Sequence, residues 1–361
     1  MISIAFIFGT RPEIIKLAPL INETYSRNTF RERAYDPILI NTGQHKELLY
    51  PMLDLFGLKC HYNLEIMEEN QTLTGTMAKA VASISKVLSF HKPDYVVVQG
   101  DTTTTFAGAL AAFYNGIKVI HIEAGMRTHD LNSPFPEEAH RQMVSKIAHL
   151  HFCATESNSK ELINEGISSS KIHVVGNTGL DSIEQIVMKH LKDKPTSNRK
   201  KILLTLHRRE SFGEPIKKIL EAVNYLADYG GIEILFPVHP NPNVIEAVNK
   251  FLRKNESVKI VNPLDYLSFT QAMWDSDVIL SDSGGVQEEA PFLGRPVVVL
   301  REKTERTETL GKTSFLVGSD TSKIISATMN VLNREENFER DFSYGDGYTS
   351  QRILDIIENH K

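Results

Sequence analysis

Cysteine is nearly absent from this 361-residue chain, in which Cys60 and Cys153 are the only two. Two cysteines exclude a disulfide framework and a cysteine-built zinc site, and they are typical of a reducing compartment. The chain also has no apolar run long enough to span a membrane, since Arg11 and Glu13 end the N-terminal stretch MISIAFIFGTRPE. This stretch lacks the basic region and cleavage site of a signal peptide and predicts a buried strand. We therefore expect a cytoplasmic protein that contacts no membrane.

An excess of positive charge is missing as well. The formal charge is −5 and the pI is near 6.2, which argues against a surface for nonspecific nucleic-acid binding. No G-x-G-x-x-G follows a predicted strand, and in the P-loop-like stretch ending TLGKTS (309–314) Arg306 stands where the first glycine belongs. NAD-dependent redox chemistry and ATP hydrolysis are therefore disfavoured. No pair of histidines has the spacing of a metal site with supporting carboxylates, so we expect neither a cofactor nor a metal.

What the chain does contain is a regular alternation of short apolar runs with helix-length segments. The runs carry no polar alternation, which is typical of parallel strands covered on both faces. The segments between them repeat apolar residues at helical spacing, and the alternation predicts βαβ units in doubly wound α/β sheets. The predicted strands lie at 2–8, 37–41, 95–100, 118–125, 150–155 and 172–178, and in a second series at 201–206, 232–238, 258–262, 277–285 and 296–300.

The two series of strands predict two domains. The chain exceeds the usual size of a single core, and the polar stretch KHLKDKPTSNRKK (189–201) separates the series as a linker would. We predict two Rossmann-like domains, residues 1–178 and 179–346, with the functional site in the cleft between them. The segment 347–361 is predicted to form a helix that can pack on either domain and is assigned here to the first.

Acidic residues follow several of the predicted strands. In open α/β sheets ligands bind beyond the carboxyl ends of the strands, where Asp101 and Glu123 lie. A charge in that place is costly unless it is paired or used, although the threonines after Asp101, or Asp101 itself, could cap the next helix. SPFPEEAHRQM (133–143) adds Glu137, Glu138 and Arg141 at a helix start, where acids are common for dipole reasons alone. Together the carboxylates predict an acidic cluster in the cleft.

The stretch LSDSGGVQEEAPFLGRPVVVL (280–300) predicts an anion site. Ser283, Gly284 and Gly285 stand where a strand turns into a helix, and glycines let the backbone approach a phosphate. A plain helix cap, with Asp282 or Ser283 bonded to the helix start, explains the same residues. A glutamate one helical turn later, Glu288 or Glu289, has the chemistry to bind a ribose diol.

Further cations and histidines lie at other strand ends. Arg11 and Lys16 fall near the start of the helix after the first strand, and two cations there can clamp a phosphate. His207 ends a strand beside two arginines, and His239 lies in a proline-rich loop. A histidine in such a place can act as an acid or base, or it can be a hydrogen-bonded structural residue.

As a set, these segments resemble the bacterial nonhydrolysing UDP-N-acetylglucosamine 2-epimerases over essentially the whole chain. The resemblance implies the two-Rossmann architecture of glycosyltransferase-B enzymes, an active site between the domains, a homodimer, and reversible conversion of UDP-GlcNAc into UDP-ManNAc. The segments that carry it are FGTRPEIIKLAPL, TGQHKELL, GDTTTTFAGALAAFY, HIEAGMRTHDLNSPFPEEAHR, GNTGLDS, LHRRESFG, PVHPNPNV and LSDSGGVQEEAPFLGRPVVVLREKTERTE.

The chemistry of the sugar explains the composition expected of the cleft. The hydrogen on carbon 2 has no neighbouring carbonyl and is barely acidic, so an enzyme must either oxidise an adjacent carbon or expel the leaving group on carbon 1. Without a site for NAD, the second route is favoured: UDP leaves, the carbon 2 proton is lost, and 2-acetamidoglucal forms before UDP adds back. Carboxylates serve the cationic sugar and the proton transfers, while cations hold the departing pyrophosphate.

The resemblance also assigns roles to individual residues. It implies that Asp101 and Glu123 transfer protons at carbon 2, that Glu137 stabilises positive charge or relays a proton, and that His207 is essential. The implied substrate contacts are Arg11, Lys16, Arg141 and His207 for phosphate or sugar, Ser283, Gly284 and Gly285 for the pyrophosphate, Glu289 for the ribose, Phe269 for the uracil, Arg306 for the diphosphate, and His239 as a further binding residue.

The chain departs from the family at a possible allosteric site. Many bacterial members bind UDP-GlcNAc as an activator, through a segment that matches Gln44 and His45 here and a later one that includes Gln71. Glu47 stands where regulated members have glutamine, and Asn70 where they have arginine. A carboxylate in place of an amide, and a lost cation, weaken a diphosphate site. Activation is therefore an open question at this stage.

Four other functions fit parts of the pattern. A related epimerase would act on another UDP-2-acetamido sugar, such as a 6-deoxy or diacetamido derivative. A hydrolysing epimerase would release free sugar, but such enzymes diverge from GTRPE at the proline, which this chain keeps as Pro12. A glycosyltransferase of the same fold would need an acceptor cleft and would not need three carboxylates. A UDP-sugar sensor would not need them either.

Overall fold

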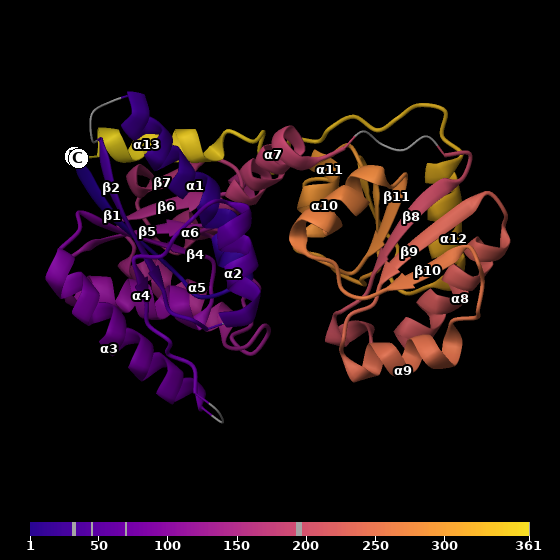
Figure 1. The fold of residues 1–361 in the computed structure, drawn as a ribbon, viewed down its shortest axis with the longest axis horizontal. Coiled ribbons are helices and arrows are strands. Elements are labelled where there is room, and N and C mark those ends of the chain that lie inside the picture. Colours follow the sequence, from indigo (N-terminus) through magenta and orange to yellow (C-terminus); the bar gives the residue numbers. More distant parts are fainter. Residues whose placement is uncertain (31–33, 45, 69–70, 193–196, 361) are drawn as a thin grey trace. The chain divides into compact units, whose positions relative to one another are not determined.

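The computed structural model describes residues 1–30, 34–44, 46–68, 71–192 and 197–360. Its contacts divide the chain into two compact units. The first contains residues 1–185 and 345–361, and the second contains residues 186–344 (Figure 1). No helix of the described residues is long and apolar enough to cross a membrane.

The first unit is built on a seven-stranded parallel sheet with the order β3-β2-β1-β4-β5-β6-β7. Register is fixed by apolar residues, with Ile4 of β1 opposite Pro37 of β2 on one side and Tyr95 of β4 on the other. The strands are β1 (Ile2–Phe8), β2 (Tyr35–Asn41), β3 (Tyr62–Asn63), β4 (Tyr95–Gln99), β5 (Lys118–Ile122), β6 (Leu150–Cys153) and β7 (Ile172–Val174).

Helices cover the first sheet, and α4 approaches it closely because its residues are small. A side-chain carbon on Gly108 would lie 3.0 Å from Val98 Cγ1, so a larger residue would push against the buried strand side chains. The C-terminal α13 lies beside α1, where Arg27 binds Glu358 and Asp355 (Figure 1). The helices are α1 (Arg11–Phe30), α2 (Lys46–Leu55), α3 (Leu73–His91), α4 (Thr103–Tyr114), α5 (Glu137–Ile147), α6 (Glu156–Asn164), the 3₁₀ turn η1 (Ser169–Lys171), α7 (Thr178–His190) and α13 (Thr349–Asn359).

The second unit repeats the same plan with a six-stranded parallel sheet of order β10-β9-β8-β11-β12-β13. Its strands are β8 (Lys200–Thr205), β9 (Ile232–Pro237), β10 (Val258–Val261), β11 (Val278–Ser281), β12 (Val297–Val299) and β13 (Ser314–Leu316). Its helices are the 3₁₀ turn η2 (Arg209–Ser211), α8 (Glu214–Asp228), α9 (Pro242–Phe251), α10 (Tyr266–Asp275), α11 (Val286–Phe292) and α12 (Thr321–Leu332).

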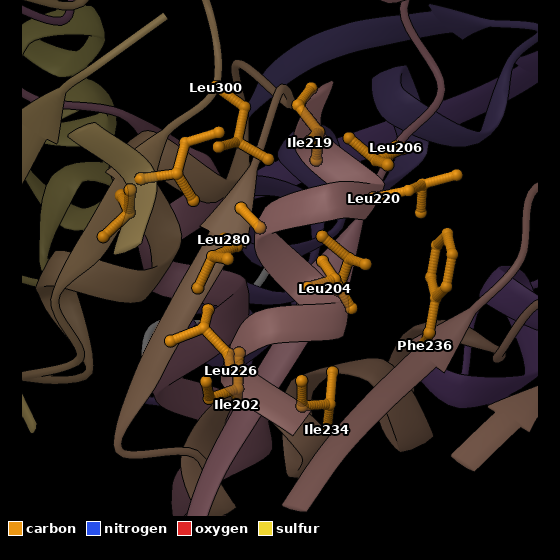
Figure 2. Packing of buried hydrophobic residues seen from close by; sticks show 14 of the residues in the cluster. Ile202, Leu204, Leu206, Ile219, Leu220, Leu226, Ile234, Phe236, Leu280 and Leu300 are labelled. Atoms are coloured by element: carbon orange, nitrogen blue, oxygen red, sulfur yellow. The ribbon is translucent and has the colours of Figure 1, made fainter. Parts of the chain in front are cut away.

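The core of the second unit lies between α8 and the sheet. Figure 2 shows Leu220 and Leu226 of α8 among side chains of β8, β9 and β11, including Leu204 and Leu280. These residues are fully buried, and each such side chain contributes on the order of 2 kcal/mol by leaving water. This packing holds the strand ends of the second unit in fixed positions.

The two Rossmann-like sheets confirm the predicted fold class. The two short strands β3 and β13 escaped prediction, because two or three residues carry no readable periodicity. The chain passes between the units within α7, after Gln185, rather than at residue 178. Residue 178 is where α7 begins, and Ser182 in its second turn donates a hydrogen bond to the Ile15 carbonyl, which ties this turn to the first unit.

Candidate active site

In each sheet the strand order reverses at one point, between β1 and β4 in the first unit and between β8 and β11 in the second. Ligands of open α/β sheets bind beyond the carboxyl ends of the strands at such a reversal. The predicted site residues that follow these four strands are Arg11, Asp101, His207, Ser283, Gly284 and Gly285, whereas Glu123 follows β5 and His239 follows β9.

Glu123 follows β5 in a strained conformation. Its φ is +63°, which non-glycine residues adopt at a cost on the order of 1 kcal/mol or more and mainly at functional positions. The carboxylate forms an ion pair with Lys16 from α1 and accepts a hydrogen bond from the Gln99 amide at the end of β4. The two donors fix the orientation of Glu123.

Asp101 follows β4 after a turn at Gly100, whose φ is +74°. Its carboxylate pairs with Arg141 of α5, a side chain that is only 9% exposed. Burial raises the pKa of Asp101, Arg141 opposes that rise, and the charges of Glu123 and Glu137 add to it. The structure therefore brings the three predicted acids into one electrostatic cluster.

Two buried histidines hold the turn that carries Asp101. His121 Nε2 donates to the Gly100 carbonyl oxygen at 2.7 Å, and His140 Nδ1 donates to the Asp101 carbonyl oxygen at 3.2 Å. Burial lowers the pKa of His121 to about 4, so its ring is neutral near pH 7. Of the two predicted caps of α4, the threonines are confirmed and Asp101 was wrong: Thr102 is the cap and accepts from Thr105 N at 3.0 Å.

Glu137 and Glu138 are neighbours with different surroundings. Glu138 is fully buried and accepts from Thr128 N at 3.1 Å, His129 N at 3.2 Å and Gln142 Nε2 at 2.8 Å. It thereby fixes the loop before α5. Glu137 is only half-buried and raises the pKa of Asp101 and His140 through its charge.

Glu13 is a fully buried carboxylate that the sequence reasoning missed. It accepts from Gly9 N at 2.9 Å and Thr10 N at 2.7 Å, and from the hydroxyls of Thr102 at 2.6 Å and Thr105 at 3.1 Å. The signal that could have found it is T-x-x-E at 10–13, the pattern of a capping box before an apolar helix.

In the second unit, Asp282 organises the loop after β8. It is fully buried and accepts from the backbone N–H of His207 and Arg208 and from Ser211 Oγ at 2.8 Å. His207 Nδ1 lies 3.1 Å from Asp282 Oδ1, while 37% of the His207 side chain remains exposed. His207 is thus oriented by a buried charge and accessible to a ligand, and the His239 ring lies 6.1 Å away.

The turn after β11 packs against Arg306. A side-chain carbon on Gly284 would lie 2.8 Å from Arg306 Cζ, so a larger residue here would displace the Arg306 guanidinium. Arg306 also pairs with Glu288 at 2.8 Å. The alternative of a cap by Asp282 or Ser283 was wrong, because α11 begins after Gly285 without a side-chain cap bond.

The remaining predicted residues lie on elements near these turns. Arg11 begins α1, and Phe269 is half-buried in α10. Glu289 Oε1 lies 3.4 Å from the Tyr266 hydroxyl, which donates to it. Of the segments predicted for an activator, Gln44 accepts from Thr104 Oγ1 at 2.8 Å and Gln71 from Glu68 N at 2.9 Å. His45 and Asn70 lie outside the described residues, as does the side chain of Glu47.

Comparison with known proteins places this geometry in a family. The family model for UDP-N-acetylglucosamine 2-epimerase matches residues 28–358. The chain belongs to the UDP-N-acetylglucosamine 2-epimerase family. Two curated UDP-N-acetylglucosamine 2-epimerases, from Neisseria meningitidis and Yersinia pestis, are 42% and 40% identical to it over 97% and 98% of its length and 98% of theirs.

A solved structure in the same family agrees with this assignment. The chain is similar to UDP-GlcNAc 2-epimerase from Neisseria meningitidis bound to UDP-GlcNAc, with a TM-score of 0.87 and 40% identity over 99% of this chain and all of the other. The predicted resemblance to this epimerase family, with its glycosyltransferase-B-like fold, is therefore confirmed.

The structure also shows buried residues to which the sequence reasoning gave no role in the site. Glu13, Gln99, His121 and Asp282 are buried behind the predicted residues and hold them in place. Their side chains lie within or directly behind strands, where apolar periodicity hides them. Asp282 had been considered only as a helix cap.

Proposed function

We propose that this chain interconverts UDP-N-acetylglucosamine and UDP-N-acetylmannosamine by inverting carbon 2 of the sugar. The observation that carries the proposal is the cluster at the β1–β4 reversal, where Asp101 and Glu123 are each paired with a cation and Asp101 is coupled to Glu137. The named activity of close relatives and the UDP-GlcNAc bound to one of them support the choice of substrate.

In the proposed reaction the bond between carbon 1 and the diphosphate oxygen breaks, and UDP leaves with the electron pair. A carboxylate removes the proton from carbon 2, and its electrons form the double bond of 2-acetamidoglucal. A proton then reaches the opposite face of carbon 2 while UDP oxygen adds again to carbon 1. The positive charge that develops on the sugar is stabilised by nearby carboxylates.

The proposed roles follow from where each residue lies. Asp101 and Glu123 exchange protons with carbon 2, because they lie at adjacent strand ends and interact electrostatically. Glu137 stabilises positive charge or relays a proton. Lys16, Arg141 and Arg11 compensate negative charge around the sugar phosphate.

Residues of the second unit are proposed to hold UDP. Ser283, Gly284, Gly285 and Arg306 contact the diphosphate together with His207, and His239 lies beside His207. Glu289 binds the ribose and Phe269 packs near the uracil. We further propose that the enzyme is a homodimer.

The deciding experiment is NMR of the purified protein with UDP-GlcNAc in deuterated water. We expect the two UDP-sugars to interconvert reversibly while deuterium enters at carbon 2, with only a slow leak of UDP and glycal. Inversion with retention of the original hydrogen would contradict this mechanism. Steady release of free sugar would indicate a hydrolysing epimerase, and turnover only of a 6-deoxy or diacetamido sugar would indicate the related epimerase.

Activation by UDP-GlcNAc is proposed to be weak in this chain. Glu47 places a carboxylate where regulated members are expected to have an amide. Asn70 places an amide where they are expected to have a cation. The rate of UDP-ManNAc conversion should therefore change less than about twofold when trace UDP-GlcNAc is added. A lag that trace UDP-GlcNAc abolishes would show that activation is intact.

A further inference from the structure

Glu13 lies outside the set of acids that the proposed reaction uses, yet it is fully buried and accepts four hydrogen bonds. Two of the donors are backbone N–H groups in the turn after β1. The other two are threonine hydroxyls that follow Asp101. One carboxylate therefore bridges the ends of the two strands at which the sheet order reverses.

Each end of this bridge carries residues of the proposed site. Gly9 and Thr10 precede the helical turns that contain Arg11 and Lys16. On the other side, Thr102 is adjacent to Asp101 and caps α4 through Thr105 N. If the turn after β1 shifted relative to the turn after β4, Lys16 and its ion-pair partner Glu123 would therefore move relative to Asp101.

A second path links Glu13 to Glu123. The single proton of the Thr105 hydroxyl is shared between Glu13 at 3.1 Å and the nearer Gln99 carbonyl oxygen at 2.6 Å, and the Gln99 amide donates to Glu123. The same threonine thus contacts both Glu13 and the residue that orients Glu123. Hydrogen bonds thus connect Glu13 to Glu123, and Thr102 connects Glu13 to the turn that carries Asp101.

Helix capping alone explains only half of this arrangement. A glutamate at the third position of α1 bonds the preceding backbone N–H groups in many helices, and it does so at the protein surface. Capping does not require the two threonine hydroxyls, and burying a carboxylate is costly without compensation. Burial in fact raises the pKa of Glu13, even though hydrogen bonds from Thr102, Gly9 and Thr10 favour its charged form.

We propose that Glu13 is a positioning residue, which holds the Lys16 and Asp101 turns at the separation that proton transfer at carbon 2 requires. The identity of the reaction rests on the proposed function. The bridge itself rests on the four contacts of Glu13. Glu13 acts by holding the backbone of the two turns in place. We expect its loss to lower kcat rather than to prevent folding.

Conservative variants distinguish a bridge from a cap. Glu13→Gln keeps an oxygen for the N–H groups of Gly9 and Thr10, and its amide N–H can donate to threonine hydroxyls that reverse their role. Glu13→Asp keeps the charge but is one methylene shorter, so it can satisfy one side of the bridge and not both. Glu13→Ala removes the bridge.

Asp181 offers a matched control in the same unit. It is also a buried carboxylate that accepts two backbone N–H groups, those of Thr349 at 3.1 Å and Ser350 at 2.6 Å at the start of α13. Burial raises the pKa of Asp181 too. Asp181→Ala therefore removes a comparable cap without touching the proposed site.

The test measures kcat and KM for UDP-GlcNAc epimerisation in each variant, together with thermal unfolding. We expect Glu13→Asp and Glu13→Ala to lower kcat on the order of 10- to 100-fold with little change in KM, as for a small misplacement of reacting groups. Glu13→Gln should restore kcat to within a few-fold of the wild type. Asp181→Ala should lower the unfolding temperature and leave kcat unchanged.

Four outcomes would overturn the proposal: wild-type kcat in Glu13→Asp, an unchanged kcat in a folded Glu13→Ala protein, no rescue by Glu13→Gln, or an equal loss of kcat in Asp181→Ala. If Glu13→Ala does not fold, the kcat of Glu13→Asp decides whether the proposal holds.

Amide hydrogen exchange at Gly9, Thr10 and Thr105 gives a readout that needs no activity. It should accelerate in Glu13→Asp whatever the substrate, so the bridge is tested even if the wild type fails to epimerise UDP-GlcNAc.

Discussion

Lys16 and Glu123 are 107 positions apart in the chain, yet they form an ion pair. The parallel sheet brings them together, because β1 and β5 flank β4 and all three carboxyl ends lie at one edge. Both side chains are largely shielded, with 22% and 14% of their surfaces exposed. Solvent therefore screens the pair only partly, and Glu123 is held in one orientation at a place where its own backbone is strained.

Replacing either proposed proton-transfer residue by its amide should abolish most turnover. Glu123→Gln and Asp101→Asn keep the shape but lose the basic oxygen, and we expect kcat to fall by about 10²- to 10⁴-fold. Unfolding temperature and UDP affinity should stay near wild type. Asp94→Asn serves as the control, since Asp94 accepts from Ser3 N at the opposite edge of the same sheet. Near-normal kcat in both amide variants would refute the assignment.

The adjacent acids Glu137 and Glu138 form a matched pair of substitutions. Glu138→Gln turns one of the two oxygens that accept three buried hydrogen bonds into an N–H donor, and it should lower the free energy of unfolding by about 1–3 kcal/mol. Glu137→Gln should leave stability within about 0.5 kcal/mol of wild type and lower kcat instead. Urea unfolding and steady-state kinetics on both proteins measure the two effects. The assignment fails if Glu137→Gln is fully active while stability is unchanged.

The fold class, and the places where polar residues follow the strands, could be predicted from the sequence for a physical reason. Strands buried on both faces leave long apolar runs, and the polar residues just beyond them stand out, as Asp101 and Glu123 do. Gln99 did not stand out, because its partner Glu123 follows another strand. The local pattern T-x-x-E indicates only the bonds of Glu13 to Gly9 and Thr10, whereas no local pattern encodes its threonine partners, which follow another strand. The positive φ of Glu123 was equally hidden, since glutamate gives no sign of a left-handed backbone.

The pH dependence of turnover should reflect the environment of Asp101. Burial raises the pKa of this carboxyl, and the nearby acids raise it further. A base must be ionised, so kcat should fall on acidification at a higher pH than an ordinary aspartate, whose pKa is near 3.8, would give. Arg141 opposes the rise.

Removing Arg141 tests the cause of this behaviour. In Arg141→Met, the acid limb of the kcat profile should move upward by about 1 to 3 pH units, the usual effect of losing a close opposite charge. The height of the profile will change as well, because Arg141 is also a proposed substrate contact. The pH midpoint of the acid limb is measured separately from the maximal kcat. An unmoved limb would mean that Asp101 is not the group that titrates.

Asp282 should link stability and nucleotide binding in the second unit. Asp282→Asn places an amide N–H beside N–H groups that need an acceptor, so we expect a loss of about 2–3 kcal/mol in unfolding free energy at pH 7.5 and UDP affinity weakened on the order of tenfold.

Although burial opposes it, the contacts with His207, Arg208 and Ser211 lower the pKa of Asp282. Its stabilisation is therefore present above the unfolded pKa, near 3.8, and is lost as pH falls through the folded value. Urea unfolding should show a constant gap between wild type and variant above about pH 5 that narrows below pH 4. Ser211→Ala, which removes one donor, should cost about 1 kcal/mol and leave the affinity for UDP nearly unchanged. A gap that stays constant down to the lowest pH at which both proteins fold would show that the charge of Asp282 is not what stabilises this loop.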